Sequence, residues 1–386
     1  MTRTMLHIHV IDEMKIGGAQ THLITMLRQV THRYDINHRV VVLFGEGELS
    51  GQIRDLGIPL DVLDLRPFLK HYRCLSAVRE LQRLFDKWRP DLVEAHLTWS
   101  RLLALYAARL SGVPRRIGFE QGDLYLNSWK FRTANFLLQS CAQHIVVCSH
   151  ALAEWAHRTH GISNSRLRVM HNCVDLARFR QTGTLAPSFN FIGKPTIFAT
   201  VGTLGQGVNK RVDISIRALA SARSAGANVA LVVCGDGDQR SELEALAAEL
   251  NLTSHVKFLG TCSDVPSVLR CCNAFCHAAP WEPFGIVAIE AMAIGLPVIL
   301  PKSGGIQEIL QSEEGGLLYE TLNHEALAQA MLQLASHPQM RREMGSAGRR
   351  VVEQQFSADR YMQRLYEIYG IDTVVEPAAI GTYASA

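Results

Sequence analysis

Short runs of apolar, often β-branched residues alternate with longer amphipathic segments along most of the chain. In the first half the predicted strands are Leu6–Ile11, His38–Phe44, Leu60–Leu65, Leu92–Ala95, Arg116–Phe119 and Ile145–Cys148. The helices predicted between them are Thr21–Val30, Leu75–Trp88, Trp99–Leu110 and Phe131–Cys141. Strands and helices that alternate at this spacing predict βαβ crossovers and a parallel sheet covered on both faces.

A second alternating series begins after residues 181–195, which show no hydrophobic period, contain two glycines and two prolines, and are predicted to be a linker. Its predicted strands are Thr196–Val201, Val229–Cys234, Val256–Leu259, Ala274–His277 and Val298–Leu300. Its predicted helices include Val212–Arg223, Arg240–Leu250, Val287–Ala293 and Leu322–Ala335. The pattern predicts an α/β protein of two doubly wound domains facing a cleft, with ligands at the carboxyl ends of the strands.

The domain boundaries follow from this pattern. We predict a first domain over residues 1–187 and a second over residues 188–357. The amphipathic segment Asp359–Tyr369 lies past the second sheet, and we expect a helix over residues 358–370 to pack back on the first domain. Residues 371–386 have no hydrophobic period and are expected to form a loose tail.

Composition narrows the class of protein. Of the 386 residues 47% are hydrophobic and 19% charged, which suits two packed cores and argues against disorder. The formal net charge of +3 gives no bulk basic field for nucleic acid. The longest apolar stretches fall short of the roughly 18 residues that a membrane-spanning helix needs, and no signal-peptide cleavage pattern follows Met5–Ile11. We therefore expect a cytoplasmic location.

The nine cysteines show no disulfide framework. Their one cluster, Cys271, Cys272 and Cys276 beside His277, lacks the second ligand pair that a zinc knuckle needs. We interpret these thiols as buried and inert, and we predict no metal site.

Two glycine-rich turns are candidate phosphate sites. Val201–Arg211 follows an apolar strand, opens a helix and delivers Lys210 and Arg211 to a region of free backbone N–H groups, which suits a diphosphate. Gly17 and Gly18 precede the first helix and leave its N-terminus open to an anion. Each also has an ordinary explanation, as solvated helix-start cations or a tight turn. The glycines at 45 and 47 and at 235 and 237 are interpreted as plain turns.

The segment from Trp281 to Val298 is the most informative. Glu290 falls on the apolar face of a short helix with no cation beside it in the sequence, and a carboxylate so placed needs a partner. Glu282 stands just before that helix, and Pro283 suits a helix start. The two carboxylates are positioned to bind hydroxyl groups of one extended ligand. Alternatively, Glu282 interacts with the helix dipole and Glu290 is a buried structural acid.

This segment, EPFGIVAIEAMAIGLPV followed by SGGIQE, resembles the E-x7-E region of glycosyltransferase family 4, retaining nucleotide-sugar enzymes of the GT-B fold. The resemblance extends through most of the chain in order and spacing. The matching pieces are Gly17–Ala19, DLVEAH at 91–96, VCS at 147–149, HNCVD at 171–175, the turn from Val201 to Lys210, and Cys234–Arg240.

The resemblance implies roles for individual residues. Glu282 would contact the hydroxyls of the donor sugar, Glu290 the nucleotide ribose, and Lys210 the diphosphate. The backbone N–H group of Gly18 would assist Lys210. So would the N–H groups at the start of the helix that contains Glu290, which belong to Phe284, Gly285, Ile286 and Val287. No metal or other cofactor is implied.

The chain departs from the family pattern at two places. Thr203 stands where the family usually has an arginine, and Arg211 stands where it has glycine, so Arg211 is a candidate replacement cation. Gln121-Gly122 stands where the family commonly has His-Gly, and an amide is no base at neutral pH. His96, Gln121 and Asp123 are therefore candidate polar partners of the acceptor.

The resemblance implies transfer of a sugar from a UDP- or GDP-sugar to an acceptor hydroxyl, in polysaccharide or glycolipid synthesis. A nucleotide-sugar epimerase and a non-catalytic nucleotide-sugar sensor are the alternatives. We expect a lipid-linked or glycan acceptor and, at the inner membrane face, an anionic surface. The first domain carries basic residues interleaved with aromatic ones, namely Arg115, Arg116, Lys130 and Arg132 with Trp129 and Phe131. The segment Arg66–Arg73 is a similar mixture. Such mixtures suit an interface between anionic headgroups and acyl chains.

Overall fold

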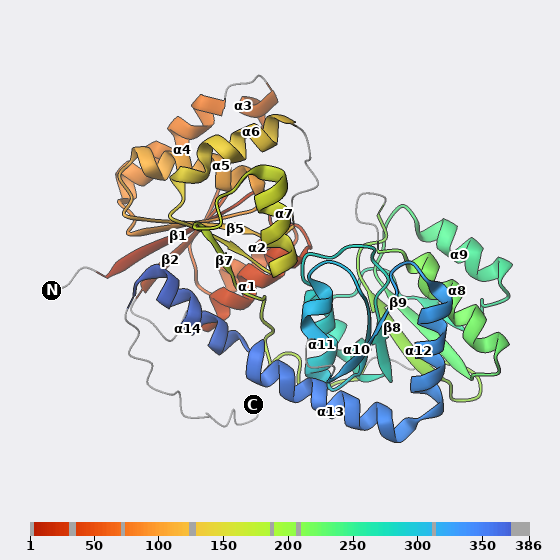
Figure 1. Cartoon of the computed structure of the whole chain (residues 1–386). Helices are drawn as coiled ribbons and strands as arrows, with labels where there is room; N and C mark the ends of the chain where they lie inside the picture. Colours follow the sequence, from red (N-terminus) through yellow and green to blue (C-terminus); the bar gives the residue numbers. More distant parts are fainter. Residues whose placement is uncertain are drawn as a thin grey trace.

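Two α/β domains follow one another in the computed structural model, each with helices on both faces of a central parallel sheet (Figure 1). The structure describes residues 4–30, 36–70, 74–122, 129–185, 189–205, 210–310 and 314–371. The α/β prediction of two doubly wound domains is confirmed. Asp123, the end of the Arg66–Arg73 mixture and the tail from residue 372 lie outside the described residues.

The first domain contains seven parallel strands in the order β3-β2-β1-β4-β5-β6-β7. They are β1 (Met5–Ile11), β2 (Ile36–Val42), β3 (Leu60–Val62), β4 (Leu92–His96), β5 (Arg115–Glu120), β6 (His144–Val147) and β7 (Leu167–Val169). Its helices are α1 (Gly18–Val30), α2 (Ser50–Asp55), α3 (Arg66–Lys70), α4 (Cys74–Trp88), α5 (Thr98–Leu110), α6 (Trp129–Leu138), the 3-10 turn Gln139–Cys141 and α7 (His150–His160).

The second domain contains six parallel strands in the order β10-β9-β8-β11-β12-β13. They are β8 (Thr196–Val201), β9 (Val229–Cys234), β10 (Val256–Phe258), β11 (Ala274–Cys276), β12 (Val298–Pro301) and β13 (Gly316–Tyr319). Its helices are α8 (Val212–Ser224), α9 (Arg240–Glu249), α10 (Val265–Arg270), α11 (Ile286–Ile294), the 3-10 turn Ile306–Leu310, α12 (His324–Ser336) and α13 (Pro338–Gln355).

The central strands are buried because helices cover both of their faces. Every residue of β4 and of β9 is buried. In each sheet the strand order reverses beside its first strand, at β1/β4 and at β8/β11. Ligands of doubly wound domains bind at this point, where the loops that follow the two strands diverge.

The C-terminal part of the chain returns to the first domain. After α13, α14 (Ala358–Tyr369) lies beside α1, and the two segments are adjacent in Figure 1 although they are far apart in sequence. Val174 donates a backbone hydrogen bond to Phe356, and the Arg115 guanidinium donates to the carbonyl of Tyr369. In the described residues no helix is both long enough and apolar enough to cross a membrane.

Several elements were not predicted from the sequence. The short strands β7 and β13 are too brief to show a period of two, and α13 has a mostly polar surface. The described cysteines form no disulfides, and Cys272 and Cys276 are buried, with thiol pKa values raised by burial.

Candidate functional site

The loops that follow β8 and β11 meet where the strand order of the second sheet reverses, and they bring Lys210 to Glu282. The Nζ atom of Lys210 lies 2.5 Å from Oε2 of Glu282. Gly202 packs against the Lys210 side chain, because a Cβ atom there would lie 3.2 Å from Cγ of Lys210. The turn at Gly235 in turn packs on Gly202, where a Cβ would lie 1.9 Å from the Gly202 carbonyl oxygen.

A histidine completes this cluster. His277, one residue past β11, places Nε2 3.2 Å from the same Oε2 atom of Glu282. Burial opposes ionisation of the carboxyl, but attraction by Lys210 and the hydrogen bond from His277 outweigh it and lower the pKa of Glu282 to about 2. Burial lowers the pKa of His277, so a neutral imidazole that donates from Nε2 is the expected form. Glu282 is therefore an ionised hydrogen-bond acceptor held between two donors.

Helix α11 begins directly after this carboxylate. Gly285 precedes the helix with a φ of +92°, and a Cβ atom there would lie 2.7 Å from Ile306, so the turn needs glycine. The first N–H groups of a helix have no intrahelical acceptor, and here they belong to the segment Phe284–Val287. Together with Lys210 they form one cationic end of the site.

Glu290 lies about one turn into α11. Its side chain is 8% exposed, and burial raises its pKa to about 8, against a weaker opposing attraction from Arg178. Arg178 lies near the end of the first domain, far from Glu290 in the sequence. The sequence around Glu290 therefore gave no sign of this cation. Glu290 is mostly protonated at neutral pH in the free protein, unlike Glu282.

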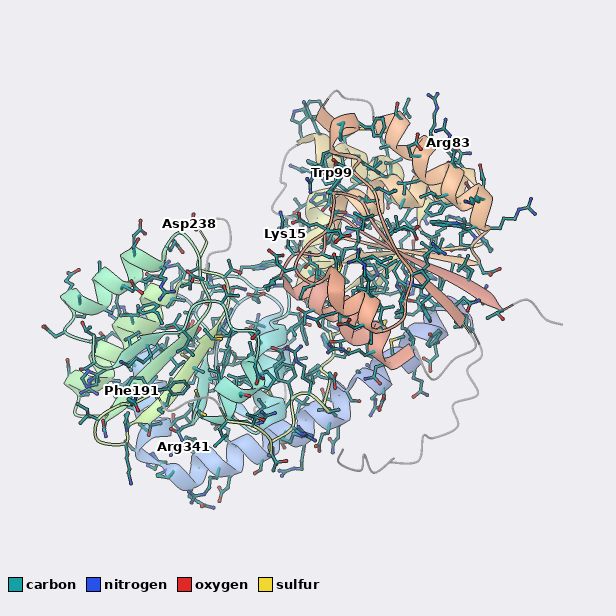
Figure 2. All side chains as sticks on the ribbon, turned by 180° about the vertical axis from the view of Figure 1, so that it is seen from behind. Lys15, Arg83, Trp99, Phe191, Asp238 and Arg341 are labelled. Carbon is teal, nitrogen blue, oxygen red and sulfur yellow. The ribbon has the colours of Figure 1, made fainter. Side chains whose placement is uncertain are left out.

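The first domain faces this site through its own glycines. A Cβ atom on Gly18 would lie 3.8 Å from Cδ1 of Ile286, so the start of α1 is close to the start of α11. A Cβ atom on Gly122 would lie only 2.6 Å from Cγ of Pro283, next to Glu282. Lys15, in the loop before α1, extends toward the second domain (Figure 2) and forms an ion pair with Glu13 at 2.8 Å.

The candidate acceptor residues occupy different environments. Gln121 is partly buried beside Gly122, and its Oε1 atom has no hydrogen-bond donor among the described residues. His96 is 1% exposed, stacks on Phe119 and lies 3.3 Å from Glu94, so its ring is enclosed in the first domain. The acceptor roles of both residues stay predictions.

Arg211 is committed to a different partner. Its guanidinium donates two hydrogen bonds of 2.8 Å to the carboxylate of Asp213. Its φ is +48°, the left-handed conformation that glycine adopts easily. This explains why the resembling family has glycine at this position. Thr203 is exposed on the neighbouring turn.

A carboxylate of the second domain joins the two domains. Glu308 accepts hydrogen bonds from the backbone N–H groups of His150 (3.0 Å) and Ala151 (2.9 Å) at the start of α7, and from Nε2 of His171 (2.9 Å). Beside it a Cβ atom on Gly305 would lie 2.5 Å from Cβ of Ser149. The matching pieces of the sequence at 147–149 and 171–175 therefore serve to position the domains.

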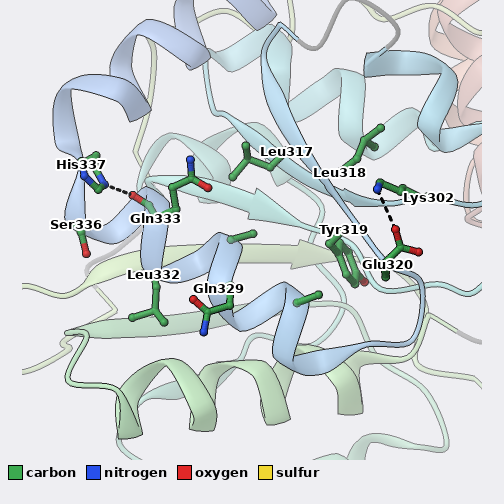
Figure 3. Close-up of a pocket in the computed structure, with 12 residues that line it drawn as sticks. Lys302, Leu317, Leu318, Tyr319, Glu320, Gln329, Leu332, Gln333, Ser336 and His337 are labelled. Carbon is green, nitrogen blue, oxygen red and sulfur yellow. Dashed lines mark hydrogen bonds and ion pairs between the residues drawn. The ribbon is translucent and has the colours of Figure 1, made fainter.

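A groove elsewhere on the second domain lies between β13 and α12 (Figure 3). Its wall includes Tyr319, whose hydroxyl donates a 3.0 Å hydrogen bond to the carbonyl of His277. Lys302 and Glu320 form an ion pair at its rim. The groove touches the site only through the backbone of His277, and the carboxylates of Glu282 and Glu290 do not line it.

Sequence reasoning missed His277, Arg178 and Glu308 as parts of the site. His277 was assigned to the cysteine cluster, because the sequence does not show that its ring turns toward Glu282. A histidine five residues before the first glutamate of the E-x7-E segment is the signal that was available.

Comparisons with known proteins agree with this geometry. Residues 16–178 match the family described as Glycosyltransferase Family 4, and residues 183–351 match Glycosyl transferases group 1. The chain is 31% identical over 139 residues to N-acetyl-alpha-D-glucosaminyl L-malate synthase of Bacillus anthracis, covering 36% of each chain. It is 25% identical over 314 residues to putative glycosyltransferase EpsD of Bacillus subtilis, covering 76% of this chain and 80% of that protein. With three of the curated relatives that it matches, the alignment spans 36%, 42% and 37% of their length.

Solved structures share the whole arrangement. Anabaena HepE, solved in complex with UDP, superposes with a TM-score of 0.79 at 22% identity, over 95% of this chain and 100% of that one. The lipopolysaccharide outer core galactosyltransferase WaaB superposes with a TM-score of 0.73 at 18% identity, over 95% and 99%. Because the two family matches follow one another in the order of the two domains, and the fold is shared over both, the chain belongs to the group 1, family 4 glycosyltransferases with the GT-B fold.

Proposed function

We propose that this chain transfers a sugar from a nucleoside-diphosphate sugar to an acceptor hydroxyl, with retention of anomeric configuration. The observation that carries the proposal is the cluster of Lys210, Glu282 and His277 at the start of α11. It places the ionised carboxylate of Glu282, which can accept hydrogen bonds from hydroxyl groups, beside a cation and a set of free backbone N–H groups. A nucleotide sugar presents the complementary groups, sugar hydroxyls next to a diphosphate.

The same groups account for rate enhancement. Negative charge grows on the diphosphate as its bond to the sugar breaks, and donors already aimed at that charge stabilise it without reorganisation. Lys210 and the N-terminus of α11 are such donors. Glu282, held by Lys210 and His277, would fix the sugar through its hydroxyls, and Glu290 would accept hydrogen bonds from the ribose. The cationic donors belong to the chain itself, so we propose that transfer requires no metal ion.

Retention is proposed from the acceptor side of the site. Gln121 precedes Gly122, which packs against Pro283. Its amide takes up no proton at neutral pH. The departing phosphate oxygen would then accept the proton of the acceptor hydroxyl on the same face of the sugar. Gln121 is proposed to orient that hydroxyl through its Oε1 atom, which has no donor among the described residues.

The donor is proposed to be a UDP-sugar. HepE, whose fold this chain shares, was solved with UDP and with UDP-glucose. GDP-sugars are the alternative from the sequence. The test is to incubate the purified chain with UDP- and GDP-sugars and to measure nucleoside diphosphate release with and without acceptor, together with the anomeric configuration of the product by NMR. An epimerase would change the sugar without release, and a sensor would bind without either change.

The acceptor is proposed to be lipid-linked and presented at an anionic membrane surface, with the protein at the cytoplasmic face. One curated relative, LpsE of Rhizobium meliloti, is described as a lipopolysaccharide core biosynthesis glycosyltransferase, with 31% identity over 36% of this chain. The α6 helix supports a surface role, because Trp129 is 71%, Phe136 59% and Leu137 64% exposed. Lys130 and Arg132 on the same helix are also exposed, and such a mixture suits headgroups and acyl chains.

The structure sharpens the test of this surface. Arg115 and Arg116 donate to backbone carbonyls of Tyr369 and Cys141, so their guanidinium groups have structural roles. The Arg132 guanidinium likewise donates to the carbonyl of Thr159. The better variant is therefore Lys130→Gln, with Arg83→Gln on α4 as the matched control. Sedimentation with anionic liposomes should be lost for the α6 variant and retained for the control. Absence of sedimentation for the parent at low salt would refute the membrane proposal and leave the transferase proposal intact.

A further inference from the structure

A buried cluster of ionisable side chains lies in the sheet of the first domain, and the transfer mechanism proposed above assigns it no role. It consists of His7, His9, His38, Glu94 and His96, and we call it the histidine cluster. The exposed fractions are 2% for His7 and His9, 8% for His38, 0% for Glu94 and 1% for His96. Charged or polar side chains this deeply enclosed need partners.

Strand register brings the five side chains to one face. His7 and His9 alternate along β1 and so point the same way. In the parallel ladders His7 pairs with His38 of β2, and His9 pairs with Glu94 of β4. His96 follows Glu94 by two positions and shares its face. Three adjacent strands therefore hold the cluster in a rigid frame.

Two helices close this face. His22 of α1 contacts the ring of Tyr361 in α14, with centroids 4.8 Å apart, and Tyr369 of α14 contacts His7 at 5.7 Å. These helices pack in one core with Ile11, on the same side of β1 as the cluster. The cluster is thus sealed against solvent by the segment that returns from the second domain.

Most polar atoms of the cluster have no hydrogen-bond partner among the described residues. This holds for both ring nitrogens of His7 and His96, for Nδ1 of His9, for Nε2 of His38 and for both carboxylate oxygens of Glu94. In the described part of the chain, the ion-pair contacts of Glu94 are with histidines alone. The Nδ1 atom of His9 lies 2.7 Å from the carboxylate and can donate to it only in the tautomer that carries the proton on Nδ1.

Nitrogens of three histidines converge on one carboxylate oxygen, as they would around a shared ion. Oε2 of Glu94 lies 2.7 Å from Nδ1 of His9, 3.3 Å from Nε2 of His96 and 3.5 Å from Nε2 of His7. A tetrahedron whose ligands lie about 2.0–2.1 Å from Zn²⁺ has edges of about 3.3 Å. The ligand atoms of His9, Glu94 and His96 all lie within 4.8 Å of one another.

His38 has the position of a supporting residue. Its Nδ1 atom lies 3.0 Å from Nε2 of His9, the nitrogen that faces away from Glu94. Histidines that bind a metal through one nitrogen commonly donate the other N–H to a nearby acceptor, which fixes the tautomer. His9 would bind the metal through Nδ1 and donate to His38 through Nε2.

We propose that the histidine cluster binds one Zn²⁺-type divalent transition-metal ion, with His9, Glu94 and His96 as ligands. Imidazole and carboxylate are suitable ligands for Zn²⁺. Because the three ligands are buried and closed off from substrate, the ion would have a structural role and would stabilise the sheet beneath α1 and α14. Its loss would affect folding and domain assembly, whereas the metal-free transfer proposed at Glu282 would need no ion.

The first test measures metal in the untagged, desalted protein by inductively coupled plasma mass spectrometry. We expect about one equivalent of zinc. Protein unfolded with a chelator should then refold to its original melting temperature only with added Zn²⁺, and refolding with Co²⁺ should give the visible absorption of a tetrahedral nitrogen–oxygen site. Substoichiometric metal in the parent, with refolding indifferent to Zn²⁺ and chelator, would overturn the proposal and leave the transferase proposal untouched.

Variants identify the ligands. Glu94→Gln and His96→Asn should each lower the bound metal at least tenfold and abolish the effect of Zn²⁺ on refolding. His22→Gln is the matched control, because His22 is 1% exposed in the same layer but lies outside the ligand group. It should lower the melting temperature while retaining the metal. Equal metal loss in the control, or full metal content in both ligand variants, would show that these residues do not hold the ion.

Discussion

Substitution of Glu290 by glutamine separates a binding role from a structural one. Glutamine has the shape of the protonated carboxyl, and the free protein holds Glu290 with a pKa of about 8 against an ordinary value of 4.5, chiefly because of burial. The folded state thus binds this proton more tightly than the unfolded chain does. The protonated carboxyl therefore contributes fully to the free energy of unfolding below about pH 4.5, and this contribution is lost as the pH rises to about 8.

The size of the effect follows from this difference. At roughly 1.4 kcal/mol for each pK unit, ionising the buried group costs about 5 kcal/mol of stability above pH 8, and local relaxation should reduce this to about 2–4 kcal/mol. Glu290→Gln avoids the loss. The variant should match the parent to within about 1 kcal/mol at pH 5 and exceed it by about 2–4 kcal/mol at pH 9.

Donor binding should change in the opposite direction. An ionised carboxylate forms stronger hydrogen bonds with ribose hydroxyls than an amide does, and the loss should cost about 1.5–3 kcal/mol, or one to two decades in Kd. Because the parent must release the proton to bind, its Kd for a UDP-sugar should fall as the pH rises from 6 to 8, whereas the variant should show no such slope.

Denaturant unfolding and calorimetric titration at pH 5, 7 and 9 measure both effects. Glu249→Gln, at an exposed position on α9, is the control and should change neither quantity. A Glu290→Gln variant that binds the donor as the parent does at all three pH values would refute the ribose role. A variant less stable than the parent at pH 9 would refute the burial argument.

Three further predictions concern the rest of the site. Lys210→Ala should slow transfer about 10²–10³-fold by removing a diphosphate cation. Arg211→Ala should slow it less than about threefold, because its guanidinium is bound to Asp213. An equal loss of the steady-state transfer rate in Arg211→Ala would contradict this ranking. Gly122→Ala should destabilise the loop by about 1–3 kcal/mol and raise the donor KM, because its Cβ would lie 2.6 Å from Pro283 at a φ of +122°; an unchanged melting temperature and KM would disprove that contact. Folded enzyme should retain full activity in excess chelator, and loss of activity with rescue by a divalent ion would show that transfer needs a metal.

Hydrophobic periodicity predicted most of the fold. The strands over residues 196–201 and 229–234 were predicted with the bounds that the structure has, because strands covered on both faces are uninterrupted apolar runs. Helix α1 begins three residues before its prediction, since Gly18–Gln20 are not amphipathic by themselves. The short edge strands β7 and β13 were missed, because three or four residues are too few to establish a period.

The chemistry of the site was partly visible in the sequence. The sequence alone showed that Glu290 is a carboxylate on an apolar helix face and that Glu282 precedes a helix start, because both facts are local. Only the tertiary structure decided that Lys210 and His277 share one oxygen of Glu282, since they come from loops after different strands. It also decided that Arg211 turns to Asp213 rather than replacing the missing cation.

The histidine cluster shows the same limit most clearly. In the sequence His7, His9, His38, Glu94 and His96 are separate polar residues within apolar runs, and His96 alone was considered as a functional residue. Parallel pairing of β1 with β2 and β4, and the return of α14 from the far end of the chain, bring them together and exclude water. Local sequence sets which side of a strand a residue faces, whereas the order in which strands pair decides which residues meet, and that order is a property of the whole chain.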